Sequence, residues 1–293
     1  MLHPGLPRYS FAGDECIFVQ VGYDMDLKVS FQIQAICNAI MEEGIPGVIE
    51  AYPANTSYLV HYNPDEIAPE ALLTRIKKIG VRSEEPVPFA SRLIEIPILY
   101  NDPWSIECAK AFASNHQDPS VTNLEFVARM NGMSVSEFIM VQTSLQYFMT
   151  MFRFLPGTQC FFPMVERSKA FSCPTYVVPR QWTPDRVLNM GGVFVGITAH
   201  DKQPGGYQLL GRSPAPVYDA ERRLVDLKES ILLNPGDRIK VRSIDRDEYD
   251  ALRASVEAGE YRFKMIKQTF EPLKYFEDPK NYLTSLEEGL RDV

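Results

Sequence analysis

The second half of the chain breaks into short strand-like runs that proline and glycine separate. These runs are YFMTMFRFL (147–155), TYVVP (175–179), GVFVGIT (192–198), YQLLGR (207–212) and DRIKVRSI (237–244). Many short strands at close spacing are typical of a sheet that closes on itself, because closure removes the unpaired edges. The pattern therefore predicts a β-barrel in this half of the chain.

The first 90 residues alternate between strand-like and helix-like patterns. Residues 16–22 alternate as a strand does, and apolar residues from Val29 to Ile40, at steps of four, three and four, then line one helical face. Two further strand-like runs and a helix that ends at Gly80 follow. The order is β-α-β-β-α, and one more short strand completes a split βαβ sandwich.

An acidic, proline-bearing stretch, EEPVPFAS (84–91), is typical of a linker and marks the expected domain boundary. We therefore expect an α+β protein with a small split-βαβ domain over 1–90 and a β-barrel domain over 91–245. A helical or extended tail over 246–293 completes the chain. Three helices are expected inside the barrel domain, at about 104–115, 121–131 and 134–145. Ser134 and Glu137 have the spacing of a capping box, which favours a helix start there.

Charge and cysteine content narrow the function classes. The formal net charge is −8 and no dense basic stripe occurs, which argues against a nucleic acid partner. Five scattered cysteines without a C-x-x-C pair are typical of reduced thiols in a cytoplasmic protein. The start lacks a signal-peptide pattern and no run of 18 apolar residues occurs, so we expect a cytoplasmic chain that is not inserted in a membrane.

The common catalytic motifs are absent from the sequence. It contains no G-x-S-x-G elbow, Walker loop, G-x-G-x-x-G turn or H-E-x-x-H helix. Its four histidines are far apart, and none has a cysteine or carboxylate at ligand spacing, so we expect no metal site.

Four segments together resemble the KipI-type, allophanate hydrolase subunit 1 family. They are MFRFLPGTQCFF (151–162), CPTYVVPR (173–180), GGVFVGIT (191–198) and PGGYQLLGRSP (204–214). In the first domain, GDECIFVQVG and GIPGVIEAYPANTSYLVHYNPDEI are similar to family segments in the same order. The resemblance covers roughly residues 11–245. It implies a cyclophilin-like barrel after the small α+β domain, in a chain that is one subunit of a larger assembly.

The glycine-rich loop in the last of these segments is the first candidate site. Gly205 and Gly206 let the backbone approach a ligand closely, and Tyr207 and Gln208 offer an aromatic wall and an amide. Arg212 can hold a carboxylate or carbamate through two hydrogen bonds, which suits a small anionic or ureido substrate. The alternative is structural: the glycines form barrel corners and the arginine pairs with a carboxylate such as that of Asp219.

The Phe-Leu-Pro-Gly segment gives a second group of candidates. Pro156 and Gly157 either shape the mouth of a pocket or form a tight turn after a core strand. Arg153 stands where the family commonly has glycine, so its side chain either narrows the site or reaches a ligand. His200 and Asp201 lie in a loop that is shorter than the family's, and they are either a general base with its carboxylate or simply solvated.

The resemblance implies two alternative functions. The first is a subunit of an ATP-dependent amide hydrolase or carboxylase of the 5-oxoprolinase, urea-carboxylase or ketone-carboxylase type. That subunit pairs with a subunit 2-like or hydantoinase-like protein; it binds no cofactor itself, and the complex uses ATP. The second is a non-catalytic regulator whose barrel groove binds a partner such as a histidine kinase. In either case the resemblance defines the fold better than the reaction, because proteins with one fold can have many functions.

Overall fold

A computed structural model describes residues 6–82 and 87–291. The chain divides into two compact units, the first made of Met1–Ser91 and Gln268–Ser285 and the second of Arg92–Lys267 and Leu286–Val293. The expected separate tail over 246–293 is thus shared between the two units. Part of the expected linker, residues 83–86, lies outside the described residues, and Phe89 already begins a strand.

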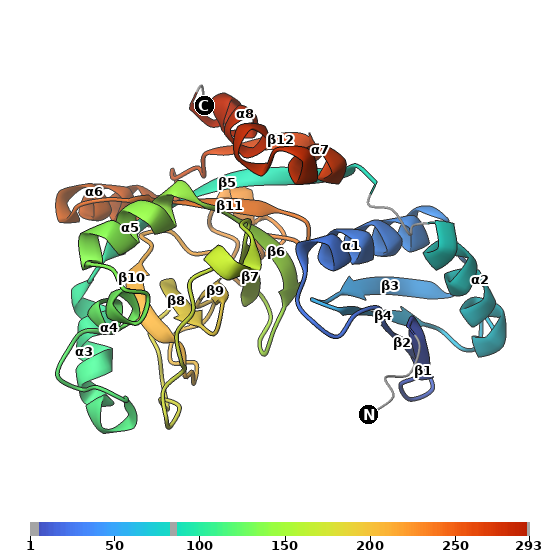
Figure 1. Ribbon diagram of the computed structural model, residues 1–293, viewed down its shortest axis with the longest axis horizontal. Coiled ribbons are helices and arrows are strands. Elements are labelled where there is room, and N and C mark those ends of the chain that lie inside the picture. Colours follow the sequence, from blue (N-terminus) through green and yellow to red (C-terminus); the bar gives the residue numbers. More distant parts are fainter. Residues whose placement is uncertain (1–5, 83–86, 292–293) are drawn as a thin grey trace. The chain divides into compact units, whose positions relative to one another are not determined.

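The first unit contains a four-stranded antiparallel sheet in the order β1-β2-β4-β3. Its elements are β1 (Arg8–Phe11), β2 (Cys16–Gln20), α1 (Leu27–Glu42), β3 (Val48–Pro53), β4 (Ser57–Tyr62) and α2 (Pro69–Arg82). The helix α1 lies along one face of this sheet (Figure 1). Its apolar stripe, including Ile33, Ile36 and Ile40, is buried against Val60 of β4 and Leu72 of α2.

One detail of this unit differs from the expectation. The edge position beside β2 is filled by β1, which precedes β2 in the chain, and not by a last strand after α2. The next strand, β5 (Phe89–Tyr100), belongs to the other sheet. The apolar pattern alone could not show this, because β1 is a short edge strand whose four residues are mostly exposed.

The second unit is built on a closed β-barrel, as expected. Its strands follow the order β10-β8-β9-β7-β6-β11-β5, and pairing of β5 with β10 closes the ring within the described residues. The further bounds are β6 (Gln146–Phe152), β7 (Gln159–Pro163), β8 (Val187–Gly191), β9 (Phe194–Ile197), β10 (Gln208–Arg212) and β11 (Arg238–Ser243). The strand β12 (Met265–Phe270) is also hydrogen-bonded to β5 and is the last strand in the order of this sheet.

Gly211 allows the barrel to close. Closure rests on the pairs Gly211 with Tyr100 and Arg212 with Leu99. A Cβ atom at Gly211 would lie 2.6 Å from the carbonyl oxygen of Leu99, so a side chain there would force the two strands apart.

Three strands differ from the sequence prediction. The run TYVVP (175–179) is not a strand, since prolines bracket it and remove donors that a ladder needs. Conversely, β7 and β8 were not predicted, because all five residues of each are buried and the sequence does not alternate.

Helices cover one side of the barrel (Figure 1). The three expected ones are α3 (Pro103–Ala111), α4 (Asn123–Met130) and α5 (Val135–Ser144), and they contact β10 and β11. The predicted capping box of Ser134 and Glu137 is confirmed. The last helices are α6 (Arg246–Glu257), α7 (Pro272–Glu277) and α8 (Pro279–Arg291). Within residues 6–82 and 87–291, no helix has both the length and the apolar character needed to cross a membrane.

Candidate functional site

A cavity of about 490 Å³ opens in the second unit. Three segments contribute to its wall: the β6–β7 turn (from Arg153 to Thr158), residues between Thr175 and Thr183, and the glycine-rich loop from Gln203 to Tyr207. Asn189 of β8 and Thr198, directly after β9, complete it. The cavity therefore brings together Arg153, Gly205, Gly206 and Tyr207 from the sequence prediction.

The two glycines bind the loop to the neighbouring segment through the backbone. Gly205 and Arg180 exchange two hydrogen bonds, with N–O distances of 2.8 and 3.1 Å, and the amide of Tyr176 donates to the carbonyl of Gly206 at 2.7 Å. A Cβ at Gly205 would lie 3.3 Å from the hydroxyl oxygen of Thr183. Glycine at this position therefore lets the loop backbone approach Thr183 without strain.

Arg153 presents a guanidinium to the cavity. Its Nε donates to the carbonyl of Gln159 at 3.0 Å, and its guanidinium carbon lies 4.4 Å from the centre of the Tyr207 ring. No ion pair joins it to a carboxylate of the described residues, and its two terminal nitrogens make no hydrogen bond there. The terminal nitrogens are thus available to a ligand, while the rest of the side chain is held in place.

Two glycines make room for this arginine and its tyrosine. A Cβ at Gly196 would collide with Nη2 of Arg153, and a Cβ at Gly191 would lie 2.5 Å from the ring of Tyr207. Both glycines belong to strands of the barrel, β8 and β9. The stacked pair therefore fits the barrel only because two wall positions lack side chains.

Arg180 is a second guanidinium on the cavity wall. Its side chain is only 1% exposed, and its guanidinium carbon lies 4.3 Å from the centre of the Tyr176 ring. Nε and Nη2 are each 3.4 Å from the hydroxyl of Thr183, and Nη1 has no hydrogen-bond partner among the described residues. Burial lowers the pKa of this guanidinium, but an arginine stays protonated at neutral pH.

The ring under Arg180 is fixed by a buried polar network. The hydroxyl of Tyr176 donates to Oδ1 of Asn123 at 2.9 Å, and the ring of His116 packs edge-on against it at 4.6 Å between centroids. Burial raises the pKa of Tyr176, so its phenol is neutral at physiological pH. These contacts fix the orientation of the Tyr176 ring, on which the guanidinium of Arg180 stacks.

The cavity wall contains no acidic side chain among the residues that form it. Two positive charges thus face it without a compensating carboxylate, in a chain whose net charge is −8. Uncompensated charge in a partly desolvated site attracts an anion more strongly than the same charge on an open surface.

Arg212 and Gln208 lie away from the cavity. Arg212 is paired with Asp185, donates from Nε to the Asp185 carbonyl at 3.0 Å, and stacks on Trp104 at 4.9 Å. Although burial opposes it, the charges of Arg186 and Arg212 hold the pKa of Asp185 below its ordinary value. Arg212 is therefore a structural residue, and the predicted ligand contact is wrong.

The expected structural partner of Arg212 was also wrong, because Asp219 pairs with Arg223 at 3.0 Å. Gln208 is fully buried and is held from both sides. Its Oε1 accepts from Nε2 of His116 at 2.8 Å and its Nε2 donates to the carbonyl of Pro174 at 2.9 Å.

Pro156 and Gly157 form the turn between β6 and β7. The amide of Thr158 donates to the carbonyl of Leu155 at 3.0 Å, and Gly157 has a φ of +77°. A Cβ on Gly157 would lie 2.7 Å from the ring of Tyr218, so glycine is required for this packing as well. The turn interpretation holds, and neither residue is part of the cavity wall.

His200 and Asp201 do not form a dyad. Nε2 of His200 donates to the carbonyl of Pro156 at 2.7 Å, and its ring packs on Tyr218 with centroids 4.5 Å apart. Asp201 is exposed and has no bond to the histidine ring. The histidine therefore anchors the β6–β7 turn, and the structure offers no base–carboxylate pair at this position.

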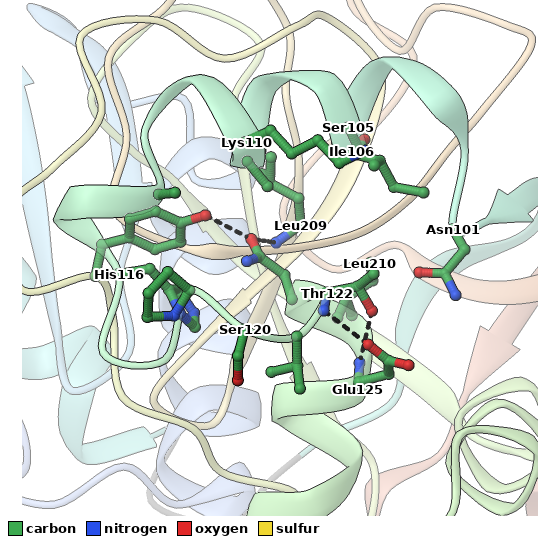
Figure 2. Close-up of a pocket in the computed structure, with 16 residues that line it drawn as sticks. Asn101, Ser105, Ile106, Lys110, His116, Ser120, Thr122, Glu125, Leu209 and Leu210 are labelled. Atoms are coloured by element: carbon green, nitrogen blue, oxygen red, sulfur yellow. Dashed lines mark hydrogen bonds between the residues drawn. The ribbon is translucent and has the colours of Figure 1, made fainter.

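A second, smaller cavity of about 210 Å³ lies between α3, the start of α4 and β10 (Figure 2). Lys110 of α3 and Glu125 of α4 both project toward it (Figure 2). The Glu125 carboxylate is bonded to the amide of Thr122 at 2.7 Å in a capping box, so it serves the helix start. None of the predicted site residues lines this cavity, and the larger cavity is the better candidate.

Arg180 and Tyr176 were not among the predicted site residues. The segment that holds them, CPTYVVPR, was one of the four that carried the family resemblance, so a signal was present. In the described parts of the chain, no group of three or more His, Cys, Asp and Glu side chains could hold a metal ion.

A match to a protein-family model shows which family the chain belongs to. The family model for the carboxyltransferase domain, subdomain C and D, matches residues 7–227. The chain belongs to this carboxyltransferase-domain family. Among characterised relatives, a 5-oxoprolinase subunit of Bacillus subtilis is 26% identical over 252 residues, covering 82% of this chain and 94% of that protein.

Larger proteins also contain a region similar to this chain. The urea amidolyase of Saccharomyces cerevisiae is 23% identical over 295 residues, which is 96% of this chain but only 16% of that protein. The crystal structure of the Kluyveromyces lactis urea carboxylase superposes with a TM-score of 0.79 at 19% identity, over 97% of this chain and 26% of that one. The carboxyltransferase-domain fold is thus shared over nearly the whole length.

Proposed function

We propose that this carboxyltransferase-family chain is one component of an ATP-dependent amide hydrolase or carboxylase, and that its barrel cavity holds the carboxyl-bearing substrate. The observation that carries the proposal is Arg153, whose two terminal nitrogens have no hydrogen-bond partner among the described residues, in a cavity whose wall has no acidic side chain. The relatives, which are urea amidolyases and 5-oxoprolinase subunits, support the reaction class.

The cavity residues are suited to binding and charge stabilisation. A carboxylate or carbamate accepts two hydrogen bonds from the terminal nitrogens of Arg153, while the ring of Tyr207 prevents the guanidinium from turning away. Of the side chains on the wall, none is a histidine, cysteine, aspartate or glutamate that could act as nucleophile or general base. The chain therefore contributes orientation and an electrostatic field, and other components supply the reacting groups.

This division of labour sets the expected partners. The chain itself binds no cofactor, and ATP is used by a subunit 2-like, hydantoinase-like or larger partner of the complex. One named relative is a subunit, and the urea amidolyases are about six times longer than the matched region, since it spans 16% of them. On this proposal the region matched here works together with such components.

A regulatory role is the second candidate, and exposed apolar side chains favour it. Phe154 is 87% exposed, and Val177 and Val178 are 70% and 54% exposed next to the cavity-lining Tyr176. Exposed apolar side chains of this size commonly mark a protein contact. On this alternative the same rim docks a partner protein and the cavity has no substrate.

The test is activity of the reconstituted complex. The chain is purified with the products of neighbouring genes, and ATP turnover is assayed with 5-oxoproline, urea and ketones with bicarbonate. We expect Arg153→Met to lower kcat/KM by about 10²-fold or more, as loss of a charge-stabilising donor does. Arg129→Met, which removes an exposed arginine paired with Asp118, is the matched control. Full activity in the absence of this chain contradicts the proposal.

A further inference from the structure

The cavity holds two guanidinium groups where binding one carboxylate requires only one. Arg153 comes from the β6–β7 turn and Arg180 from the segment before β8, and both line the same cavity. We infer that the ligand carries two anionic groups, as a small dicarboxylate does, with one bound by Arg153 and the other by Arg180. This inference rests on the proposed function of the cavity and narrows its substrate class.

Arg180 lacks the partners that a structural arginine has. Arg212 and Arg186, two other buried arginines of the barrel unit, both pair with Asp185. Arg180 is less exposed than either, yet no carboxylate of the described residues pairs with it: its guanidinium lies on the Tyr176 ring, makes two 3.4 Å contacts to Thr183, and leaves Nη1 without a hydrogen bond there. Burying a charge without a counter-charge costs several kcal/mol, so such a group is retained where a bound anion compensates it.

Gly205 is the residue of the cavity wall that lies next to Nη2 of Arg180. A Cβ at this position would lie 3.6 Å from Nη2 of Arg180 and 3.3 Å from the hydroxyl of Thr183. The residue lies on the cavity wall, and its backbone is paired with that of Arg180. Glycine at position 205 therefore keeps a side chain out of contact with Nη2 of Arg180 on this side of the cavity.

Charge balance points to the same ligand class. The wall has no acidic residue, so a ligand with one carboxylate leaves one guanidinium uncompensated in a partly desolvated site. A second carboxylate removes that deficit and adds charge-assisted hydrogen bonds. A volume of about 490 Å³ admits chains of three to five carbons with room for water.

The experiment is isothermal titration calorimetry of the full chain at fixed ionic strength. Malonate, succinate and glutarate are compared with propionate, butyrate and pentanoate, their monocarboxylate analogues of equal chain length. We expect the best dicarboxylate to bind at least about tenfold more tightly than its analogue, since hydrogen bonds to charged groups contribute that much. In Arg180→Met the ratio of the two dissociation constants, monocarboxylate over dicarboxylate, falls to about one.

Three further variants make the result decisive. Gly205→Ala keeps both arginines and places a methyl group about 3.6 Å from Nη2, between that nitrogen and a ligand, so it lowers the ratio even if Arg180→Met fails to fold. Arg153→Met weakens binding of both ligand classes, and the surface control Arg129→Met preserves the wild-type ratio.

Two outcomes overturn the inference. If the wild-type chain binds a dicarboxylate and its analogue equally well, and Arg153→Met loses both, the two-anion inference fails while the carboxylate site stands. If no carboxylate of either class binds the wild-type chain, the proposed substrate site fails as well.

Discussion

Replacing Arg180 with methionine is expected to stabilise the protein, which no structural arginine would do. The guanidinium is 1% exposed and has no ion pair among the described residues, and its burial opposes the charged form. Removing an uncompensated buried charge relieves several kcal/mol. The losses are a stack on Tyr176, about 1–2 kcal/mol, and long hydrogen bonds to Thr183, about 0.5–1 kcal/mol together.

The net expectation is a rise of about 1–2 kcal/mol in the free energy of unfolding. Methionine keeps most of the aliphatic stem, so little packing is lost. For a unit of this size the rise corresponds to a Tm increase of roughly 2–8 °C. Urea is the appropriate denaturant because it adds no ionic strength, and the slope m shows whether the transition has changed in character.

Tryptophan fluorescence follows the relevant unit. Both tryptophans of the chain, Trp104 and Trp182, lie in the second unit, so their signal reports the barrel rather than the first unit. A loss of more than about 2 kcal/mol in Arg180→Met would refute the reasoning, because it would show that the guanidinium is a structural partner. The surface variant Arg129→Met should unfold as the wild-type chain does.

Three other substitutions test the remaining structural claims. Arg212→Met removes one of the two arginines that pair with the half-buried Asp185, together with the stack on Trp104, and is expected to cost about 2–3 kcal/mol in urea denaturation while carboxylate affinity stays unchanged; a cost below about 1 kcal/mol contradicts this. The folded-state pKa of Asp185 is lowered, so its stabilisation is present above its unfolded-state pKa of 3.8 and is lost as the pH falls through the folded value. The loss in free energy of unfolding that Asp185→Asn causes, relative to the wild-type chain, should therefore become smaller in acid. A loss that stays constant from pH 7 to about pH 2.5 argues against the ion pairs with Arg186 and Arg212. Gly211→Ala places a Cβ 2.6 Å from the Leu99 carbonyl and should cost about 3 kcal/mol, with faster amide exchange along the β5–β10 pair; wild-type stability would refute its role in closure.

The barrel was predictable because its signals are local. Proline and glycine mark the ends of short strands, and Ser134 with Glu137 marks a helix start three residues apart. The short edge strand β1 and the fully buried strands β7 and β8 carry no alternating pattern, so the same reasoning missed them. The place of β1 beside β2 is a tertiary choice that sequence spacing does not record.

The site shows the same division between local and distant information. The glycine pair at 205 and 206 and the adjacent Tyr207 were recognisable as a close backbone approach beside an aromatic wall. Arg212 was favoured because it follows Gly211, but its partner Asp185 is 27 residues earlier in the chain, where no spacing rule points to it. Whether a buried arginine is paired or free decides its role, and only the folded chain shows which.

A crystal structure of the full chain with butyrate bound tests the central claim most directly. We expect the carboxylate within about 2.7–3.1 Å of both terminal nitrogens of Arg153, with the alkyl chain in the cavity. A carboxylate bound elsewhere, or a side-chain carboxylate of the protein itself on Arg153, would contradict it.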